Sequence, residues 1–263
     1  MVFHDASKYI YDWLKSQPFV KEESITDWLL FFVSTHSDKI IYKAFSRNEE
    51  AFNGSDWEWW VLTPTYAFRF LIQAKKLKGN ADNYPNLSYS NRNGMQIDLL
   101  INSAFEKRAL PLYAFYSCQQ PELEKQLMNI SYIDHSVLKW CESCINGCFL
   151  SSAHWIKETV FNAPRKRIYE SELINASFGI SIIDINNQKT EKEISNLLLK
   201  ANSYYRNQFD NEKGIAYLFN ELPNYVRVLI ENMNNKQIFS WYESEFRYDL
   251  SSLSGISIID LRN

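Results

Sequence analysis

Apolar residues recur at helical spacing near the start of the chain. Five of them follow the i, i+3, i+4, i+7, i+8 pattern of an amphipathic helix: Ile25, Trp28, Leu29, Phe32 and Val33. Ser24 precedes this stripe and is a suitable N-cap, which predicts that the helix begins immediately after it. A shorter amphipathic helix is predicted over residues 9–14, ending before Pro18.

Four later segments have the composition of β-strands. Residues 39–45 are mostly apolar or aromatic, and residues 111–116 are continuously apolar, as expected of a buried central strand. Residues 56–60 and 68–75 also predict strands, but they mix apolar side chains with polar ones. Helical spacing returns at residues 96–105. The resulting order of helix, three strands, helix and strand predicts an α/β fold.

The second half of the chain has a less regular pattern. Helical spacing predicts helices over residues 137–158 and 191–209, and a third over residues 223–233. Residues 178–185 and 254–261 resemble each other, and both segments predict strands. A single resemblance of this length does not indicate a repeat architecture.

The two mixed strands are the candidates for chemistry. Side chains two positions apart point to the same face of a strand, so Asp56 shares a face with Glu58. By the same rule Gln73 shares a face with Lys75, while Ala74 points to the core. If the two strands pair as a hairpin, two carboxylates, an amide and an ammonium group converge. Such a set is typical of metal-dependent hydrolysis.

Composition limits the class of protein. A chain of 263 residues with 46% hydrophobic side chains can bury a substantial core. We find no signal-peptide pattern and no apolar stretch near the roughly 18 residues that span a bilayer. Four cysteines do not form a disulfide framework in a chain this long, which agrees with a reducing compartment. These features predict a cytoplasmic protein without a membrane partner.

The cysteines allow two further interpretations. Cys141, Cys144 and Cys148 suggest zinc, but on one helix the outer two lie about 10 Å apart along the axis. Three sulfurs on one zinc ion must lie within about 4 Å of each other, so the spacing favours buried structural cysteines. A cysteine hydrolase would use Cys148 or Cys118 with His154. The flanking residues lack a nucleophile elbow or a glycine-rich oxyanion loop.

The sequence around the mixed strands resembles a known nuclease family. Gly54-Ser55-Asp56 followed by Gln73-Ala74-Lys75 is similar to the active site of the PD-(D/E)XK nuclease superfamily, in its Mrr-like restriction endonuclease branch with Gln-x-Lys. The resemblance extends to a bacterial family that carries this site. It implies a restriction-endonuclease-like αβββαβ core with a mixed central sheet. We assign this core to residues 1–120 and a mainly helical α+β extension to residues 121–263.

The resemblance assigns roles to the polar residues of the two strands. Asp56 matches the metal-binding aspartate, and Gln73 matches the second ligand position. Lys75 matches the lysine that orients the attacking water or stabilises developing charge. Glu58 is added as a metal ligand because it shares a face with Asp56. The cofactor implied is Mg²⁺ or Mn²⁺, since both prefer hard oxygen ligands.

Other charged residues are candidates for supporting roles. The resemblance gives Glu23 or Glu50 as the additional acid that many members of the superfamily carry, while an acid at a helix start such as Glu23 also interacts favourably with the helix macrodipole. The formal net charge of −3 does not indicate a nucleic-acid-binding protein, but a local basic patch can bind. Arg69, Lys76 and Lys78 form such a patch beside the predicted site and are assigned to nucleic-acid binding.

The function implied is a metal-dependent endonuclease that hydrolyses phosphodiester bonds of DNA, with RNA as the other candidate substrate. The resemblance also implies a role in restriction or anti-phage defence and a homodimer, because cleavage of both strands usually needs two active sites. The alternative is a catalytically silent nucleic-acid-binding or toxin-like interaction module on the same fold. Cleavage of plasmid DNA distinguishes the two.

Overall fold

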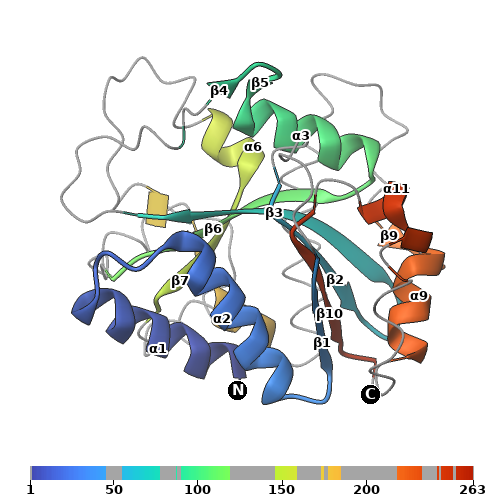
Figure 1. Ribbon diagram of the computed structural model, residues 1–263, viewed down its shortest axis with the longest axis horizontal. Coiled ribbons are helices and arrows are strands. Elements are labelled where there is room, and N and C mark those ends of the chain that lie inside the picture. Colours follow the sequence, from blue (N-terminus) through green and yellow to red (C-terminus); the bar gives the residue numbers. More distant parts are fainter. Residues whose placement is uncertain are drawn as a thin grey trace.

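A computed structural model places helices on both faces of an eight-stranded mixed sheet (Figure 1). The structure describes residues 2–45, 55–77, 87, 90–118, 146–158, 173–174, 177–184, 218–232, 242, 244–250 and 253–262. The strands are β1 (Ile40–Ala44), β2 (Trp57–Leu62), β3 (Ala67–Lys76), β6 (Leu110–Tyr116), β7 (Cys148–Ser152), β8 (Phe178–Gly179), β9 (Leu218–Phe219) and β10 (Gly255–Asp260). A separate pair consists of β4 (Ser90–Asn91) and β5 (Gly94–Met95).

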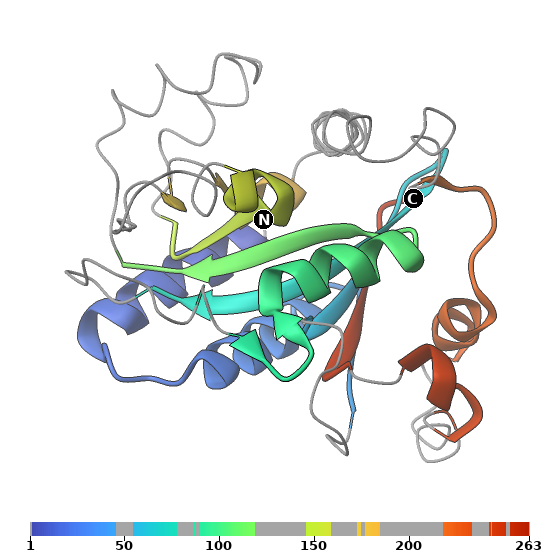
Figure 2. The same cartoon turned by 90° about the horizontal axis from the view of Figure 1, so that it is seen from above.

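The helices flank this sheet. They are α1 (Val2–Ser16), α2 (Glu22–Thr35), α3 (Gln96–Glu106), α6 (Ala153–Ile156), α9 (Asn224–Glu231), α11 (Arg247–Leu250) and the 3-10 helix η2 (Ile180–Asp184). Helices α1 and α2 cover one face, while α3 and α6 lie on the other (Figures 1 and 2). Apart from the separate β4–β5 pair, which lies between β3 and α3, the predicted order of helix, three strands, helix and strand is observed from α2 to β6, and the α/β class is confirmed.

The order of strands in the sheet is β1-β10-β2-β3-β6-β7-β8, and β9 pairs with β3. Strands β2 and β3 form the predicted antiparallel hairpin, with Trp57 opposite Ile72. Strand β6 lies parallel to β3 and is reached through α3, which is the usual crossover between parallel strands. Strand β10 lies parallel to β2 and antiparallel to β1.

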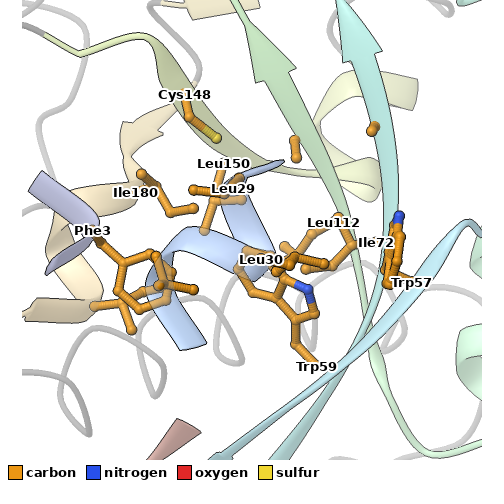
Figure 3. Packing of buried hydrophobic residues seen from close by; sticks show 14 of the residues in the cluster. Phe3, Leu29, Leu30, Trp57, Trp59, Ile72, Leu112, Cys148, Leu150 and Ile180 are labelled. Atoms are coloured by element: carbon orange, nitrogen blue, oxygen red, sulfur yellow. The ribbon is translucent and has the colours of Figure 1, made fainter. Parts of the chain in front are cut away.

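The face under α1 and α2 holds the largest group of buried apolar side chains (Figure 3). Trp57 and Trp59 point into this group, where they pack with Leu29 and Leu30 of α2. Both tryptophans are 3% exposed. The alternation along β2 therefore assigns these two rings to the core and leaves the opposite face for other side chains.

The opposite face carries two separate apolar groups. One contains Tyr113 and Phe115 of β6 with Leu100 of α3. The other contains Trp60 of β2 and Tyr225 of α9. Asp56, Gln73 and Lys75 belong to this face of β2 and β3, so they lie on the side of the sheet that faces α3 and α9.

The C-terminal segment is part of the central sheet. Strand β10 lies between β1 and β2, and β7 extends the sheet beyond β6. Gly255 opens β10 where only a glycine fits, because a Cβ there would lie 2.0 Å from the Trp57 ring and 2.6 Å from the Lys43 carbonyl oxygen. Both halves of the predicted division at residue 120 thus contribute to one sheet, and the sheet shows no boundary at that position.

One of the two similar segments is not the predicted strand. Residues 254–261 form β10 as predicted, but the strand predicted over residues 178–185 ends at Gly179 and continues as η2. The 3-10 turn brings Asp184 to the N-terminus of α1, where its carboxylate accepts hydrogen bonds from the backbone N–H groups of Phe3 (3.0 Å) and His4 (2.7 Å). Capping of α1 by a distant carboxylate explains the difference.

The helix predicted over residues 137–158 is confirmed only near its end, where Ala153–Ile156 form α6, and is wrong for the residues directly before α6. Residues 148–152 form β7, and Cys148 is buried in this strand. Gly147 explains the change, because a Cβ there would lie 2.2 Å from the backbone nitrogen of Tyr11. The backbone at this point packs directly on α1, and its N–H group donates to the Ser7 carbonyl oxygen at 3.0 Å. Cys141 and Cys144 lie outside the described residues.

The remaining helices predicted for the second half have different outcomes. Helix α9 confirms the helix predicted over residues 223–233. The helix predicted over residues 191–209 lies outside the described residues. Among the helices in the described ranges, none is long and apolar enough to cross a membrane.

Candidate active site

Asp56 and Gln73 meet at the end of the β2–β3 hairpin. Asp56 directly precedes β2, and its backbone is held on both sides, by the carbonyl oxygen of Ile72 (2.9 Å) and by the N–H group of Ser254 (2.7 Å). Its Oδ2 atom accepts hydrogen bonds from the Gln73 side-chain nitrogen at 2.5 Å and from the backbone N–H of Ala74 at 3.1 Å. The two residues at the centre of the predicted site are therefore in direct contact.

Gln96 adds a second amide to this contact. It is the first residue of α3, and its Nε2 atom donates to Oε1 of Gln73 at 2.8 Å. The Gln73 nitrogen also lies 3.2 Å from the carbonyl oxygen of Ala74, and Gln73 is only 2% exposed. The Oε1 atom of Gln96 is buried and has no hydrogen-bond partner. A short chain of polar groups thus runs from Asp56 through Gln73 to Gln96.

Helix α2 supplies an acid that the predicted helix start excluded. The helix begins at Glu22 rather than after Ser24, and its N-cap, Lys21, forms no side-chain capping bond. The Glu22 side chain reaches the end of β3, where Oε2 accepts a hydrogen bond from the backbone N–H of Lys76 at 2.5 Å. This bond attaches the first turn of α2 to the strand that carries Gln73.

Glu22 lies in the electric field of the site. Burial raises the pKa of its carboxyl, and the negative charges of Asp56 and Glu23 raise it further. The positive charge of Lys75 and the hydrogen bond from Lys76 oppose this rise. Glu22 therefore interacts with both Asp56 and Lys75, whereas the predicted acid Glu23 is exposed one position along the helix.

Lys75 projects from β3 on the same face as Gln73. Its side chain is half-buried, and its strand neighbour in the parallel register is Phe115 of β6. Within the described ranges, no hydrogen bond or ion pair is made by its ammonium group, which remains available to an incoming group near Glu22. The predicted placement of Lys75 on the face that carries Gln73 is thus observed, and its role stays a prediction.

Tyr113 adds a buried hydroxyl to the same face. It is the strand neighbour of Gln73 across the β3–β6 pair, and its side chain is fully buried. The hydroxyl makes no hydrogen bond in the described part of the chain. Burial raises the pKa of this phenol well above its ordinary value, and the charges of Asp98 and Asp56 raise it further. The hydroxyl therefore stays protonated and can donate to a ligand.

Glu58 is placed elsewhere. Its carboxylate is fully buried and accepts hydrogen bonds from Arg69 through Nε (3.0 Å) and Nη2 (2.6 Å), from Trp60 through Nε1 (2.6 Å) and from the Tyr225 hydroxyl. Both carboxylate oxygens are thus used within the protein. The structure does not bring Glu58 into the contact of Asp56 with Gln73, so the predicted ligand is part of a buried ion pair instead.

Two predicted nucleic-acid-binding residues are also used within the protein. Arg69 faces Glu58 and donates to the carbonyl oxygen of Lys107 at 2.8 Å. The ammonium group of Lys76 donates to the carbonyl oxygens of Pro18 (2.9 Å) and Val20, which fixes the loop between α1 and α2. Both side chains therefore hold neighbouring parts of the fold together. The other predicted residues, Lys78 and Glu50, lie outside the described residues.

The structure opposes the cysteine hydrolase interpretation. Cys148 is fully buried, and burial raises the pKa of its thiol far above neutrality. Burial also lowers the pKa of His154 to about 4, with a smaller contribution from the charge of Lys157. A nucleophilic cysteine needs an accessible thiolate and a base near pH 7, and these environments provide neither.

The oxygen atoms of the site fit a hard divalent cation. No three His, Cys, Asp or Glu side chains in the described ranges lie close enough together to hold a metal ion. Mg²⁺, however, is often held by one or two carboxylates with water and neutral oxygens. The Asp56 carboxylate and the Ala74 carbonyl oxygen converge on the Gln73 nitrogen, and the Glu22 carboxylate interacts electrostatically with Asp56. This set suits Mg²⁺ or Mn²⁺ better than zinc.

Comparison with known proteins identifies the family. Residues 1–253 match a family described as "Family of unknown function (DUF6615)". The chain belongs to the DUF6615 family. Searches of curated proteins and of solved structures found no match.

In this DUF6615 chain, two residues of the site were missed by sequence reasoning. Glu22 was excluded because Ser24 is a better capping residue than Lys21, although the acidic pair at positions 22 and 23 was a usable signal. Gln96 was assigned only to a helix. Its position at the start of a helix, directly after a loop rich in glycine and asparagine, was the signal available.

Proposed function

We propose that this chain is a metal-dependent nuclease that hydrolyses phosphodiester bonds of DNA. The observation that carries the proposal is the contact of Asp56 with Gln73 across the β2–β3 hairpin, with Lys75 one position beyond Ala74. A second acid, Glu22, approaches from the start of α2. Carboxylates, neutral oxygens and an ammonium group gathered at one end of a sheet are the groups that phosphoryl hydrolysis requires.

The order of elements supports a restriction-endonuclease-like core. Apart from the separate β4–β5 pair, the segment from α2 to β6 has the order of helix, three strands, helix and strand. Asp56 directly precedes the second strand, and Gln73 lies in the third. Strand β10 adds a neighbour to β2 on the other side. In this reading the second half completes the core sheet, and the predicted role in restriction or anti-phage defence follows from the nuclease activity.

The residues of the site divide the chemistry between them. Asp56, the Ala74 carbonyl oxygen and Gln73 would hold the cation, with Glu22 beside them. A bound Mg²⁺ would polarise the phosphate and lower the pKa of a coordinated water molecule. In hydrolysis the water oxygen forms a bond to phosphorus and gives its proton to Glu22, while the ester P–O bond breaks and its electron pair stays on the leaving ester oxygen, which takes up a proton from solvent.

Lys75 and Glu22 act on the substrate and on water. The Lys75 ammonium stabilises the negative charge that develops on the phosphate. Within the described ranges, Glu22 accepts its backbone hydrogen bond through Oε2 only, so its other oxygen can orient water. Burial and the neighbouring acids raise the pKa of Glu22, which makes it a better proton acceptor than an exposed carboxylate. The Tyr113 hydroxyl is a donor on the same face.

The test is cleavage of supercoiled plasmid DNA and of a labelled single-stranded RNA, each with Mg²⁺, Mn²⁺ or excess chelator. Wild-type protein is expected to cut DNA only with a divalent cation. Asp56→Ala and Lys75→Ala are expected to lower the rate at least about 100-fold. Glu23→Ala is the matched control, because Glu23 is exposed beside Glu22. Equal cutting by wild type and both site variants contradicts the proposal.

A catalytically silent binding module is the second candidate. It is favoured by the Gln73 amide, which donates to Asp56 in the position where a second carboxylate is common in the resembled family. Binding of DNA by wild type without cleavage under any metal condition supports this candidate. The same protein measured by sedimentation tests the homodimer that two-strand cleavage requires.

A further inference from the structure

The orientation of the Gln73 amide is fixed by its neighbours. Two groups that can only accept hydrogen bonds, the Asp56 carboxylate and the Ala74 carbonyl oxygen, lie 2.5 and 3.2 Å from one end of this amide. That end must therefore be the nitrogen, because an oxygen there would face two other oxygens. The amide oxygen faces the opposite way and accepts a hydrogen bond from Gln96 at 2.8 Å.

This orientation is incompatible with metal binding by Gln73. An amide nitrogen carries two donor hydrogens and offers no lone pair to a hard cation, whereas the amide oxygen is an ordinary Mg²⁺ ligand. If Gln73 ligates a cation held by Asp56, its amide must turn by about half a rotation. The nitrogen then faces Gln96, whose own nitrogen currently points toward Gln73.

Two donors that face each other without an acceptor are unfavourable in a buried position. Gln96 can remove this conflict, because its Oε1 atom is buried and without a hydrogen-bond partner among the described residues. Rotation of the Gln96 amide brings this oxygen toward the Gln73 nitrogen. The Gln96 side chain thus already carries the hydrogen-bond acceptor that a turned Gln73 amide would need.

We propose that Gln73 and Gln96 form a coupled pair of amides that turn together when a divalent cation binds. In the observed arrangement, the Gln96 nitrogen donates to the Gln73 oxygen, and the Gln73 nitrogen donates to Asp56. In the metal-bound arrangement, the Gln96 oxygen accepts a hydrogen bond from the Gln73 nitrogen, and the Gln73 oxygen faces the cation. Gln96 is then a positioning residue, which acts on the metal through Gln73. The inference rests on the proposed metal-dependent function and specifies how the side chains of its site rearrange when the cation binds.

The direct test is NMR spectroscopy of the side-chain amides of uniformly ¹⁵N-labelled full-length chain during titration with Mg²⁺. The Gln73 and Gln96 resonances are identified by their loss in Gln73→Met and Gln96→Met. Both pairs of signals are expected to shift with the same midpoint. If neighbouring backbone signals of Ala74 respond to Mg²⁺ while both amides remain unchanged, the coupled rotation is wrong and metal binding stands. If no signal responds to Mg²⁺, both the rotation and the metal-dependent function are wrong.

Two substitutions of similar size separate the arrangements. Gln96→Glu can only accept, so it favours the metal-bound arrangement and is expected to raise Mn²⁺ affinity. Gln96→Lys can only donate, so it holds Gln73 in its observed orientation and is expected to lower Mn²⁺ affinity about 10-fold or more. Calorimetry with Mn²⁺ alone measures both effects without substrate. Well-dispersed backbone spectra establish that each variant is folded.

The charge introduced at position 96 also acts on a cation directly, and a double-mutant cycle removes this contribution. Both substitutions are repeated in a Gln73→Met background, where no amide remains to turn and only the effect of charge is left. A difference between Gln96→Glu and Gln96→Lys that is at least about five times larger with Gln73 present supports the coupling. Equal differences in the two backgrounds overturn it.

Discussion

Asp56 and Glu58 lie two positions apart at the start of one strand, on one face of one sheet, yet they have opposite environments. Asp56 contacts neutral amide groups and lies near Lys75 and Glu22. Glu58 is enclosed by Arg69, Trp60 and Tyr225. Spacing along a strand fixes the face on which a side chain lies. The residues on neighbouring elements decide whether the side chain can meet a ligand.

The pairing of β2 with β3 explains this difference. Arg69 lies opposite Trp60 in the antiparallel register, so its guanidinium reaches the Glu58 carboxylate diagonally. Gln73 lies beyond the last residue pair, Trp57 with Ile72, and is therefore beside Asp56. The same hairpin thus supplies a cation to one acid and an amide to the other, which separates a buried ion pair from the candidate site.

Glu58→Gln tests the stabilising half of the comparison and is expected to have the largest effect. The substitution leaves the Arg69 charge buried without its partner, which should lower the free energy of unfolding by about 3–5 kcal/mol. Urea denaturation measures this loss. The double variant Glu58→Leu/Arg69→Met, which removes both charges, is expected to recover much of the stability. A double variant as unstable as the single one contradicts this interpretation.

Asp56→Asn tests the reactive half. Asparagine keeps the shape of the side chain but weakens its interaction with a cation, so cleavage should fall at least about 100-fold, or about 2.7 kcal/mol in activation free energy. Stability should change by less than about 1 kcal/mol. Cleavage rates and urea midpoints are measured on the same preparation. A large loss of stability would mean that Asp56 is structural, as Glu58 is.

Tyr225→Phe tests whether α9 contributes to stability alone or also to cleavage. The Tyr225 hydroxyl donates a hydrogen bond to Glu58, and a hydrogen bond to a charged group contributes about 2 kcal/mol to stability. The substitution should therefore lower the free energy of unfolding by about this amount. Thermal unfolding measures the effect. Cleavage at a temperature below the measured transition of the variant is expected to keep the wild-type rate. A specific loss of activity in fully folded protein would assign α9 a role in catalysis.

Glu22→Gln should have the smallest effect on stability, and it should raise the free energy of unfolding, whereas Glu58→Gln and Tyr225→Phe lower it. Burial raises the pKa of the folded Glu22 above 4.5, so the stability this group contributes is present below pH 4.5 and is lost as pH rises through its folded pKa. Glutamine keeps an acceptor for the Lys76 N–H and does not titrate. The variant is therefore expected to be more stable at pH 7 by less than about 1 kcal/mol, with slower cleavage.

Urea denaturation from pH 4 to pH 8 checks the sign. The difference between Glu22→Gln and wild type should disappear at the acidic end and grow toward neutrality. A variant that is less stable than wild type at pH 7 would show that the Glu22 charge stabilises the fold. Its carboxylate would then resemble Glu58 more than Asp56.

Local sequence patterns predicted the central part of the fold well. The stripe of α2, the three following strands, α3 and β6 all follow from hydrophobic spacing, and the β2–β3 hairpin brought Asp56 and Gln73 together as predicted. These elements have their determinants within a few residues of each other. The wrong segments, residues 148–152 and 180–184, take their conformation from contacts with α1, which no local pattern contains.

The composition of the site was less predictable than its location. Alternation placed Glu58 on the correct face but could not reveal Tyr225, which approaches from a helix far along the sequence. Glu22 entered the site because α2 begins before the residue with the best capping side chain. Gln96 entered because α3 crosses over β3. Each of these contacts depends on how elements pack and not on the residue types nearby.

Strand β10 also sets the order in which the protein can be completed. Ser254 donates a hydrogen bond to the Asp56 backbone and β10 pairs along the whole of β2, so β2 has an open edge until residues 254–260 are made. Contacts between such distant segments form slowly. A ribosome-bound chain that has already produced Asp56, Gln73 and Lys75 therefore still lacks a finished site. Synthesis therefore delays completion of the candidate site until residues 254–260 emerge.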